Sequence, residues 1–188
     1  MPRPCGDQPT HLDERLDAVL IGGREPGVVT VADYDPLWPA RYEAVRTRIA
    51  AALGECARGL EHIGSTAVPG LAAKPIIDVL VEVDDPEDEA GFRPAMEEAG
   101  FELRVRERGH RMFRTRARDV HVHLWPAGSV ESRDYLLLRD RLRACAEDRR
   151  RYERVKRELA ERSWPDLNDY AEAKGPLIAE ILARARVV

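Results

Sequence analysis

The 188-residue chain has few cysteines, no long apolar run and no large excess of charge of one sign. Its three cysteines lie far apart and form no CxxC pair, which argues against disulfides and a structural zinc site and favours a reducing, cytoplasmic location. No apolar segment approaches the roughly 20 residues of a membrane span, and residues 1–10 lack the apolar core of a signal peptide. A net charge of −4 gives no reason to expect nucleic acid or a membrane as a partner.

The sequence also lacks the P-loop pattern GxxxxGKS/T, so a phosphate site of that kind is excluded. In its place stands EHIGSTAVPGLAAKPIIDVLVEV, residues 61–83, in which an apolar segment runs into Gly64-Ser65. A small-residue connector then leads to a β-branched strand with one isolated carboxylate, Asp78. Glycine lets a backbone approach a ligand closely, and a serine followed by a helix start offers free N–H groups to a phosphate. The predicted phosphate- or nucleotide-binding residues of this segment are Gly64, Ser65, Thr66 and Lys74.

Hydrophobic periodicity predicts a mixed sheet with helices packed on it, an α/β or α+β fold. Alternating or β-branched segments indicate strands at 28–31, 60–63, 76–83 and 101–105, and a hairpin formed by 111–116 and 120–125. Helices are expected after a Thr10 cap, after Asp35-Pro36 and from about residue 131 onward.

The same patterns suggest how the chain is organised. Residues 1–27 are expected to form an N-terminal tail and a helix, followed by one domain over 28–188. That domain would have a sheet-containing core at 28–130 and a helical C-terminal region at 131–188.

Asp78 is unfavourable on an apolar strand unless it is paired, hydrogen-bonded or bound to a metal. One interpretation is a structural salt bridge to Lys74 or to an arginine. The upstream Gly64-Ser65 favours a functional carboxylate instead, because a glycine turn beside a carboxylate is suited to a phosphate and its metal ion.

Two histidines offer further metal ligands. His121 and His123 alternate with apolar residues, so they share one strand face and form a plausible transition-metal pair. The alternative is a pair of imidazoles on a solvated sheet face. If the strands are neighbours, Asp78, His121 and His123 predict a site for a divalent cation, whether Mg²⁺, Mn²⁺ or Zn²⁺, and imidazoles favour the latter two.

A basic edge precedes this strand. Arg114 stands between Arg111 and Arg116 and is a candidate to bind phosphate. Pairing of these arginines with acidic neighbours is the alternative.

These residues resemble the GrpB family. The resemblance runs from about residue 28 to the C-terminus and is most specific in GSTAVPGLAAKPIID. Further matching elements are Tyr34-Asp35-Pro36-Leu37-Trp38-Pro39, Arg133-Asp134-Tyr135-Leu136, the pair Tyr152/Lys156 and the pair Tyr170/Lys174.

The family is similar to the nucleotidyltransferase superfamily, which implies a nucleotidyltransferase-like mixed sheet. In that superfamily a Gly-Ser turn contacts phosphates, and an Asp-x-Asp strand holds two metal ions. The resemblance places Gly64-Ser65 on that turn and implies that Asp78 is the second, catalytic aspartate. It places Ile76 at the first aspartate, where an apolar side chain cannot bind a metal.

Three functions therefore stay open. The first is binding of a nucleotide or other phosphorylated small molecule, with catalysis left undecided. The second is divalent-metal-dependent nucleotidyl or phosphoryl transfer using Asp78 and His121/His123. The third is a non-catalytic accessory module, since some members of the family are fused to the kinase that completes coenzyme A synthesis. The sequence specifies no oligomeric state.

Overall fold

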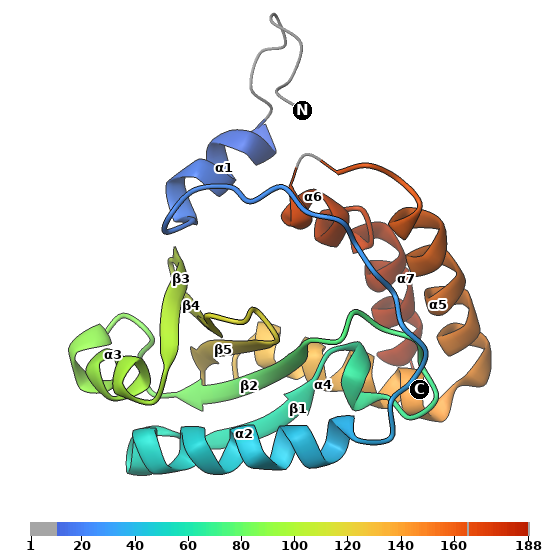
Figure 1. The fold of residues 1–188 in the computed structure, drawn as a ribbon. Coiled ribbons are helices and arrows are strands. Elements are labelled where there is room, and N and C mark those ends of the chain that lie inside the picture. Colours follow the sequence, from blue (N-terminus) through green and yellow to red (C-terminus); the bar gives the residue numbers. More distant parts are fainter. Residues whose placement is uncertain (1–10, 165, 188) are drawn as a thin grey trace, which may run out of the picture.

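The computed structural model describes residues 11–164 and 166–187, which form a five-stranded mixed sheet with helices around it (Figure 1). The strands are β1 (Gly59–Ile63), β2 (Ile77–Val83), β3 (Phe101–Glu107), β4 (His110–Thr115) and β5 (Val120–Pro126). The helices are α1 (His11–Val19), α2 (Trp38–Leu53), α3 (Glu89–Glu98), α4 (Val130–Ala144), α5 (Ala146–Ala160), α6 (Leu167–Glu172) and α7 (Gly175–Ala185). Two short 3-10 turns, η1 (Gly54–Cys56) and η2 (Ser65–Ala67), flank β1. The predicted mixture of sheet and helices is confirmed.

The sheet has the strand order β1-β2-β5-β4-β3, with β2 and β5 parallel and the other neighbours antiparallel. The parallel register pairs Asp78 with His121 and Leu80 with His123. The predicted hairpin of β4 and β5 is present and pairs Arg114 with His121. Because paired residues lie on the same face of a sheet, Asp78, His121 and Arg114 form one row across three strands.

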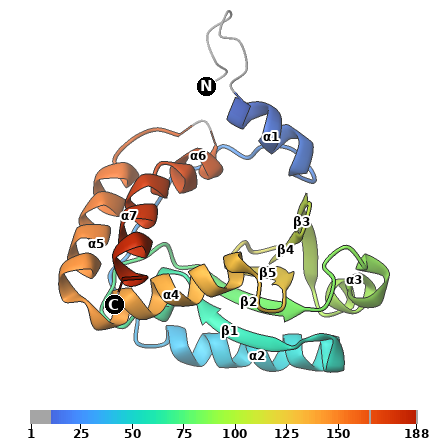
Figure 2. The same cartoon turned by 180° about the vertical axis from the view of Figure 1, so that it is seen from behind.

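The other face of the sheet forms the main apolar core. Val79 and Val122 are fully buried there, together with Ile49 of α2 and Met96 of α3. The face that carries Asp78 is turned toward α4 to α7, which curve around it with α1 into an open ring (Figures 1 and 2). One face thus provides stability, and the other is left for polar side chains.

The helical C-terminal region is anchored to the connector between β1 and β2. Val68 and Leu71 of this connector are completely buried against Leu142, Tyr152 and Ile181, which come from α4, α5 and α7. These contacts hold the C-terminal helices close to the Gly64-Ser65 turn.

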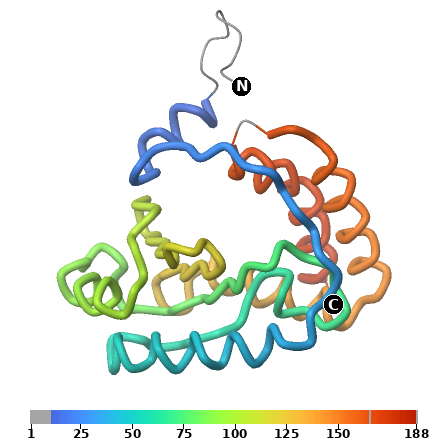
Figure 3. The backbone as a smooth tube through the Cα atoms, viewed as in Figure 1, coloured from blue at the N-terminus to red at the C-terminus, as the bar shows by residue number. Residues whose placement is uncertain are grey.

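The predicted strand at 28–31 is wrong. The segment is extended but joins no strand of the sheet, and the nearby pairing is a single bridge between Ala32 and Ala73. Val29 is instead buried against Leu159 and Tyr170 of the C-terminal helices. Figure 3 shows the chain between α1 and α2 running alongside these helices. Its alternating apolar residues therefore contact helices rather than a sheet.

Helix α2 begins two residues later than Asp35-Pro36 suggested. The Asp35 carboxylate accepts the N–H of Leu37 at 2.9 Å, which completes a turn before the helix starts at Trp38. The Thr10 cap proposed for α1 lies outside the described residues. Among the described residues, no helix combines the length and the hydropathy that a membrane crossing requires.

Candidate metal and phosphate site

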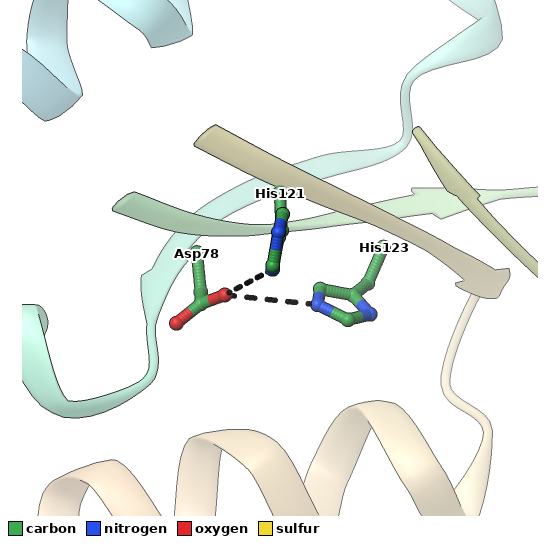
Figure 4. Close-up of side chains that lie close together, drawn as sticks. All are labelled: Asp78, His121 and His123. Atoms are coloured by element: carbon green, nitrogen blue, oxygen red, sulfur yellow. Dashed lines mark ion pairs between the residues drawn. The ribbon is translucent and has the colours of Figure 1, made fainter. Parts of the chain in front are cut away.

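Asp78, His121 and His123 meet on the polar face of the sheet (Figure 4). Asp78 Oδ1 lies 3.5 Å from His121 Nδ1 and 3.8 Å from His123 Nε2. The alternation of β5 sends both imidazoles to this face while the residues between and beside them are buried on the other. The parallel register then brings the β2 carboxylate alongside.

The electrostatics of this cluster favour an ionised carboxylate. Burial by itself would raise the pKa of Asp78, but the adjacent imidazoles of His121 and His123 outweigh it, and the pKa lies well below its usual range. All three side chains are half-buried. Asp78 thus remains an anion that two imidazoles share, and no salt bridge to Lys74 is needed to explain it.

The donor set fits a transition-metal ion. One ligand atom from each of the three residues lies within 4.8 Å of the others. Ligand atoms about 2.1 Å from a tetrahedral zinc stand about 3.4 Å apart, close to the two separations measured from Asp78. Two neutral imidazoles and one carboxylate suit zinc, manganese or iron better than magnesium, which prefers oxygen ligands.

Gly64 connects β1 to η2 and lies directly against Asp78. Its φ of 69° is in the left-handed region. A Cβ added to Gly64 would lie 3.0 Å from both Cβ and Cγ of Asp78 and would collide with the carboxylate. Glycine is therefore required both for the backbone conformation and for the close approach.

The polar face opens into a cavity of about 340 Å³ between the sheet, the C-terminal helices and the N-terminal segment. Ile76, where the resemblance places the first aspartate, also lines this cavity, so an apolar side chain occupies that position. The predicted site residues that line the cavity are Ser65, Lys74, Asp78, Arg114, His121 and His123.

Two of the predicted phosphate-binding residues already use their polar groups within the protein. Thr66 is 1% exposed, donates to the carbonyl of Ile76 at 3.0 Å and lies 3.1 Å from His62 Nε2, so it fixes the turn and does not line the cavity. Arg114 does line the cavity, but it forms two 2.7 Å hydrogen bonds with the Glu25 carboxylate. Its position matches the alternative interpretation, pairing with a carboxylate.

The sequence-based prediction of site residues missed two lysines on the helical wall of the cavity. Lys156 of α5 is 2% exposed and donates to Ser65 Oγ at 3.1 Å and to the carbonyl of Ala72. Lys174, at the start of α7, places its Nζ 4.6 Å from the centre of the Tyr170 ring. Burial, and then the charge of Lys174, lowers the pKa of Lys156 to about 7. Burial also lowers the pKa values of Lys74 and Lys174.

The amino-acid composition does point to these lysines. The chain has 30 lysines and arginines, but only Lys74, Lys156 and Lys174 are lysines, and all three line this one cavity. Among the described residues, no carboxylate lies within 4.0 Å of their ammonium groups. Three lysines without a direct counter-ion give this wall excess positive charge, which would attract an anion.

Tyr170 adds an unused hydrogen-bonding group. Its side chain lines the cavity and is 1% exposed, yet its hydroxyl has no hydrogen-bond partner among the described residues. Leaving such a group unpaired costs about 1–3 kcal/mol. A ligand in the cavity would offer the missing partner.

The comparisons with known proteins concern the family and the fold. A family model described as GrpB protein matches residues 28–184. The chain belongs to the GrpB family. A UPF0157 protein of Streptomyces coelicolor is 51% identical over 166 residues, which cover 88% of this chain and 89% of the relative. The crystal structure of the conserved protein GrpB from Enterococcus faecalis has a TM-score of 0.74 at 31% identity, covering 83% of this chain and 96% of that chain.

A more distant structure shares the fold. One chain of the GLD-2/RNP-8 complex has a TM-score of 0.50 at 18% identity, covering 70% of this chain and 45% of that chain. This similarity concerns the fold alone. The GrpB-family chain has a nucleotidyltransferase-like mixed sheet flanked by helices.

In this GrpB-family chain, residues outside the matched range also reach the cavity. Leu20 and Glu25 line it. The N–H of Glu25 donates to Asp166 at 2.6 Å, and Arg104 of β3 binds the carbonyls of Ile21 and Gly23. Residues 20–25, the N-terminal strap, are thus fixed to the sheet on one side and to α6 on the other.

Proposed function

We propose that this protein binds a nucleotide or another phosphorylated small molecule together with a divalent transition-metal ion. One observation carries the proposal: a single cavity joins a metal-type donor set on its sheet wall to a cationic wall without direct counter-ions. Phosphate oxygens bind well both to metal ions and to ammonium groups. The sheet wall consists of Asp78, His121 and His123, and the cationic wall consists of Lys74, Lys156 and Lys174.

Each group has a defined task in this proposal. Asp78, His121 and His123 would hold the ion, which would supply a positive charge to the phosphate oxygens. Gly64 lets the turn before η2 lie directly against Asp78, and Ser65 offers a hydroxyl that Lys156 already orients. Lys74, Lys156 and Lys174 neutralise the phosphate, and the Tyr170 hydroxyl supplies a further donor.

A thermal-shift screen of nucleotides and phosphorylated metabolites, with and without Mg²⁺, Mn²⁺ and Zn²⁺, tests this function. A ligand that binds only the folded protein raises its melting temperature by mass action. We expect the largest rise for a phosphorylated compound added with Zn²⁺ or Mn²⁺, and a smaller rise with Mg²⁺. A screen in which no phosphorylated compound raises the melting temperature under any metal condition would contradict the proposal.

Metal-dependent nucleotidyl or phosphoryl transfer is the second candidate. The observation that favours it is that His121 and His123 supply ligand atoms beside Asp78, where Ile76 supplies none. Release of pyrophosphate from nucleoside triphosphates in Zn²⁺ or Mn²⁺, lost in Asp78→Ala, would establish transfer. Ligand binding without such release would restrict the protein to binding.

The accessory-module interpretation has less support. It would be favoured by an apolar face exposed on the C-terminal helices. The exposed large apolar residues of the described chain are scattered instead, and they are Ile21, Val28, Leu37, Val130 and Val187.

A further inference from the structure

Three arginines line the cavity on the side of the N-terminal strap. They are Arg104 of β3, Arg114 of β4 and Arg118 of the turn between β4 and β5, and they form the arginine cluster. Arg114 is paired with His121 of β5, so the cluster begins one strand away from the metal-type donor set of the sheet wall. The cavity therefore has a second group of cations besides its cationic wall.

The cluster already holds a carboxylate, that of Glu25 in the strap. Arg114 donates one hydrogen bond of 2.7 Å to each Glu25 oxygen, and Arg118 donates a third of 3.2 Å. Two parallel N–H···O bonds are the arrangement in which arginine recognises a carboxylate. The donor positions of the cluster thus fit a small carboxylate group.

Glu25 does not neutralise the arginine cluster. Among the described residues, no other carboxylate lies within 4.0 Å of these guanidinium groups. Arg104 is 5% exposed and donates to strap carbonyls, and burial lowers its pKa. Asp166 also lines the cavity, where it accepts N–H groups of Glu25 and Asn168. Even with Asp166 included, three guanidinium groups face two carboxylates, so positive charge remains.

The backbone at Arg118 is unfavourable for an arginine. Its φ of 61° is in the left-handed region, where no other non-glycine residue of the described chain lies. Glycine would adopt this conformation at lower cost. The side chain is 55% exposed, and an ion pair as exposed as this one contributes little stability. The stability of the fold therefore gives no reason for an arginine here, whereas an anion in the cavity does.

We propose that the arginine cluster is a second anion subsite that takes a carboxylate group, and that the Glu25 side chain fills it while no ligand is bound. A ligand carboxylate enters by displacing that of Glu25, which lies on the partly exposed strap. The subsite follows from the contacts of the cluster and does not depend on a metal ion or on the cationic wall.

The position of the subsite defines a class of ligand, and this step rests on the function proposed above. Neighbouring strands lie about 4.8 Å apart, which places Arg114 about 5 Å from His121 and about 10 Å from Asp78 across the sheet. A phosphorylated carboxylic acid with a chain of about three carbons spans such a distance. Its phosphate would lie at the donor set and the cationic wall, and its carboxylate at the arginine cluster.

The first experiment uses acetate to replace the missing carboxylate in Glu25→Ala. Melting temperatures are measured in sodium acetate and in sodium chloride of equal ionic strength. At about 100 mM, we expect acetate to raise the melting temperature of Glu25→Ala by about 2–4 °C more than that of wild type, whose subsite is filled. Glu102→Ala removes an exposed pair with Arg116 outside the cavity, so it is the matched control and should respond like wild type.

The second experiment tests whether a ligand displaces Glu25 in the wild type. The probes are 3-phosphoglycerate and glycerol 3-phosphate, which differ in that the first has a carboxylate where the second has a hydroxymethyl group. By calorimetry with Mn²⁺, we expect wild type to bind 3-phosphoglycerate about five- to tenfold more tightly, because its carboxylate meets the remaining positive charge. Glu25→Ala should widen this difference. Arg118→Gly should narrow it without lowering the melting temperature, since glycine relieves the positive φ.

The outcomes separate the subsite from the proposed function. Equal responses of Glu25→Ala and wild type to acetate would overturn the subsite. Equal affinities of wild type for the two phosphorylated compounds would overturn the displacement of Glu25. If neither phosphorylated compound binds while acetate stabilises Glu25→Ala, the proposed phosphate site fails and the arginine subsite stands.

Discussion

The sheet wall and the helical wall of the cavity differ in how completely their charged side chains are paired in the absence of a ligand. On the sheet wall, the Asp78 carboxylate has two imidazole partners, and its pKa is lowered. On the helical wall, burial lowers the pKa values of Lys156 and Lys174, and no described carboxylate pairs with either. The lowered pKa values mean that keeping these lysines charged in the folded protein costs free energy.

This contrast indicates which component each wall requires. The sheet wall places one carboxylate beside two imidazoles and offers their lone pairs, so it is suited to a cation. The helical wall has excess positive charge and a Tyr170 hydroxyl with no hydrogen-bond partner in the described part of the chain, so an anion would lower its free energy. The phosphorylated ligand and metal ion proposed above would satisfy both walls at once.

The largest effect should come from the sheet wall. Asp78→Asn removes the only carboxylate of the donor set, and we expect zinc affinity to fall by more than the roughly 100-fold that an outer partner can account for. Calorimetry on metal-stripped protein measures it. Glu61→Gln is the matched control, because Glu61 is an exposed β1 carboxylate paired with Arg139 and lies outside the cavity. Equal zinc binding by Asp78→Asn and wild type would remove the sheet wall as a metal site.

How much could be predicted from sequence also differs between the walls. Asp78, His121 and His123 were found because strand alternation and a Gly-Ser turn are local patterns, and one parallel register then brings the strands together. Lys156 was missed because its contact with Ser65 spans 91 positions and depends on how α5 docks. Glu25 was missed because its contact with Arg114 spans 89 positions. The strand at 28–31 was wrongly predicted because its alternation fits a strand as well as an extended segment on helices. Local periodicity predicts which side chains share one face of an element. Which residues pack against that face depends on tertiary structure and cannot be predicted from the local pattern.

The next effect tests the contact between Gly64 and Asp78. Gly64→Ala and Gly70→Ala both place a side chain at a positive φ, 69° and 75°, so each should lose about 1–3 kcal/mol of stability from backbone strain. A Cβ at Gly70 meets open space, whereas one at Gly64 collides with Asp78. We expect about tenfold weaker zinc binding in Gly64→Ala alone, comparable to misplacing a ligand through its outer partner. Denaturation and calorimetry separate the two effects, and equal losses of zinc affinity would refute the contact's role.

On the helical wall, we expect a substitution of Lys156 to weaken anion binding without lowering the stability of the fold. Lys156→Met removes a buried cation that lacks a counter-ion, so the unfolding free energy should stay unchanged or increase. Inorganic pyrophosphate should bind about 10- to 100-fold more weakly, since a charge-assisted hydrogen bond contributes about 1.5–3 kcal/mol. Arg154→Met, on the exposed side of α5, is the matched control. A fall in stability with unchanged pyrophosphate affinity would make Lys156 structural.

A smaller effect is expected from pH. Because the pKa of Lys156 is lowered to about 7, this lysine loses its charge as the pH rises through that value. Sulfate, whose charge does not change over this range, should therefore bind more weakly at about pH 8.5 than at about pH 6. The unligated protein should become more stable as the pH rises from about 7 toward the unfolded lysine pKa near 10.4, since the unfolded state then binds more protons. Lys156→Met should weaken both dependences, with the remainder due to Lys74 and Lys174, whose pKa values are also lowered. A pH profile unchanged by that variant would exclude Lys156 as a source.

The smallest effect concerns the N-terminal strap, which supplies a carboxylate of its own. Hydrogen bonds from Arg114 lower the pKa of Glu25 to about 2, so Glu25 is ionised at neutral pH and occupies the guanidinium that a ligand phosphate would otherwise meet. Glu25→Gln should release Arg114 and raise pyrophosphate affinity a few-fold, at most about tenfold, because a partly exposed ion pair contributes little.

The ion pair of Glu25 and Arg114 also makes the stability of the fold depend slightly on pH in the acid range. The lowered pKa of Glu25 stabilises the fold above the unfolded value of about 4.5, and this contribution is lost as the pH falls toward 2. Glu102→Gln is the matched control, since it breaks an exposed pair with Arg116 outside the cavity. If a folded Glu25→Gln binds pyrophosphate no more tightly than Glu102→Gln does, Arg114 does not bind phosphate even when Glu25 no longer pairs with it. The strap would then be a structural brace, and the lysines of the helical wall would hold the anion without help from Arg114.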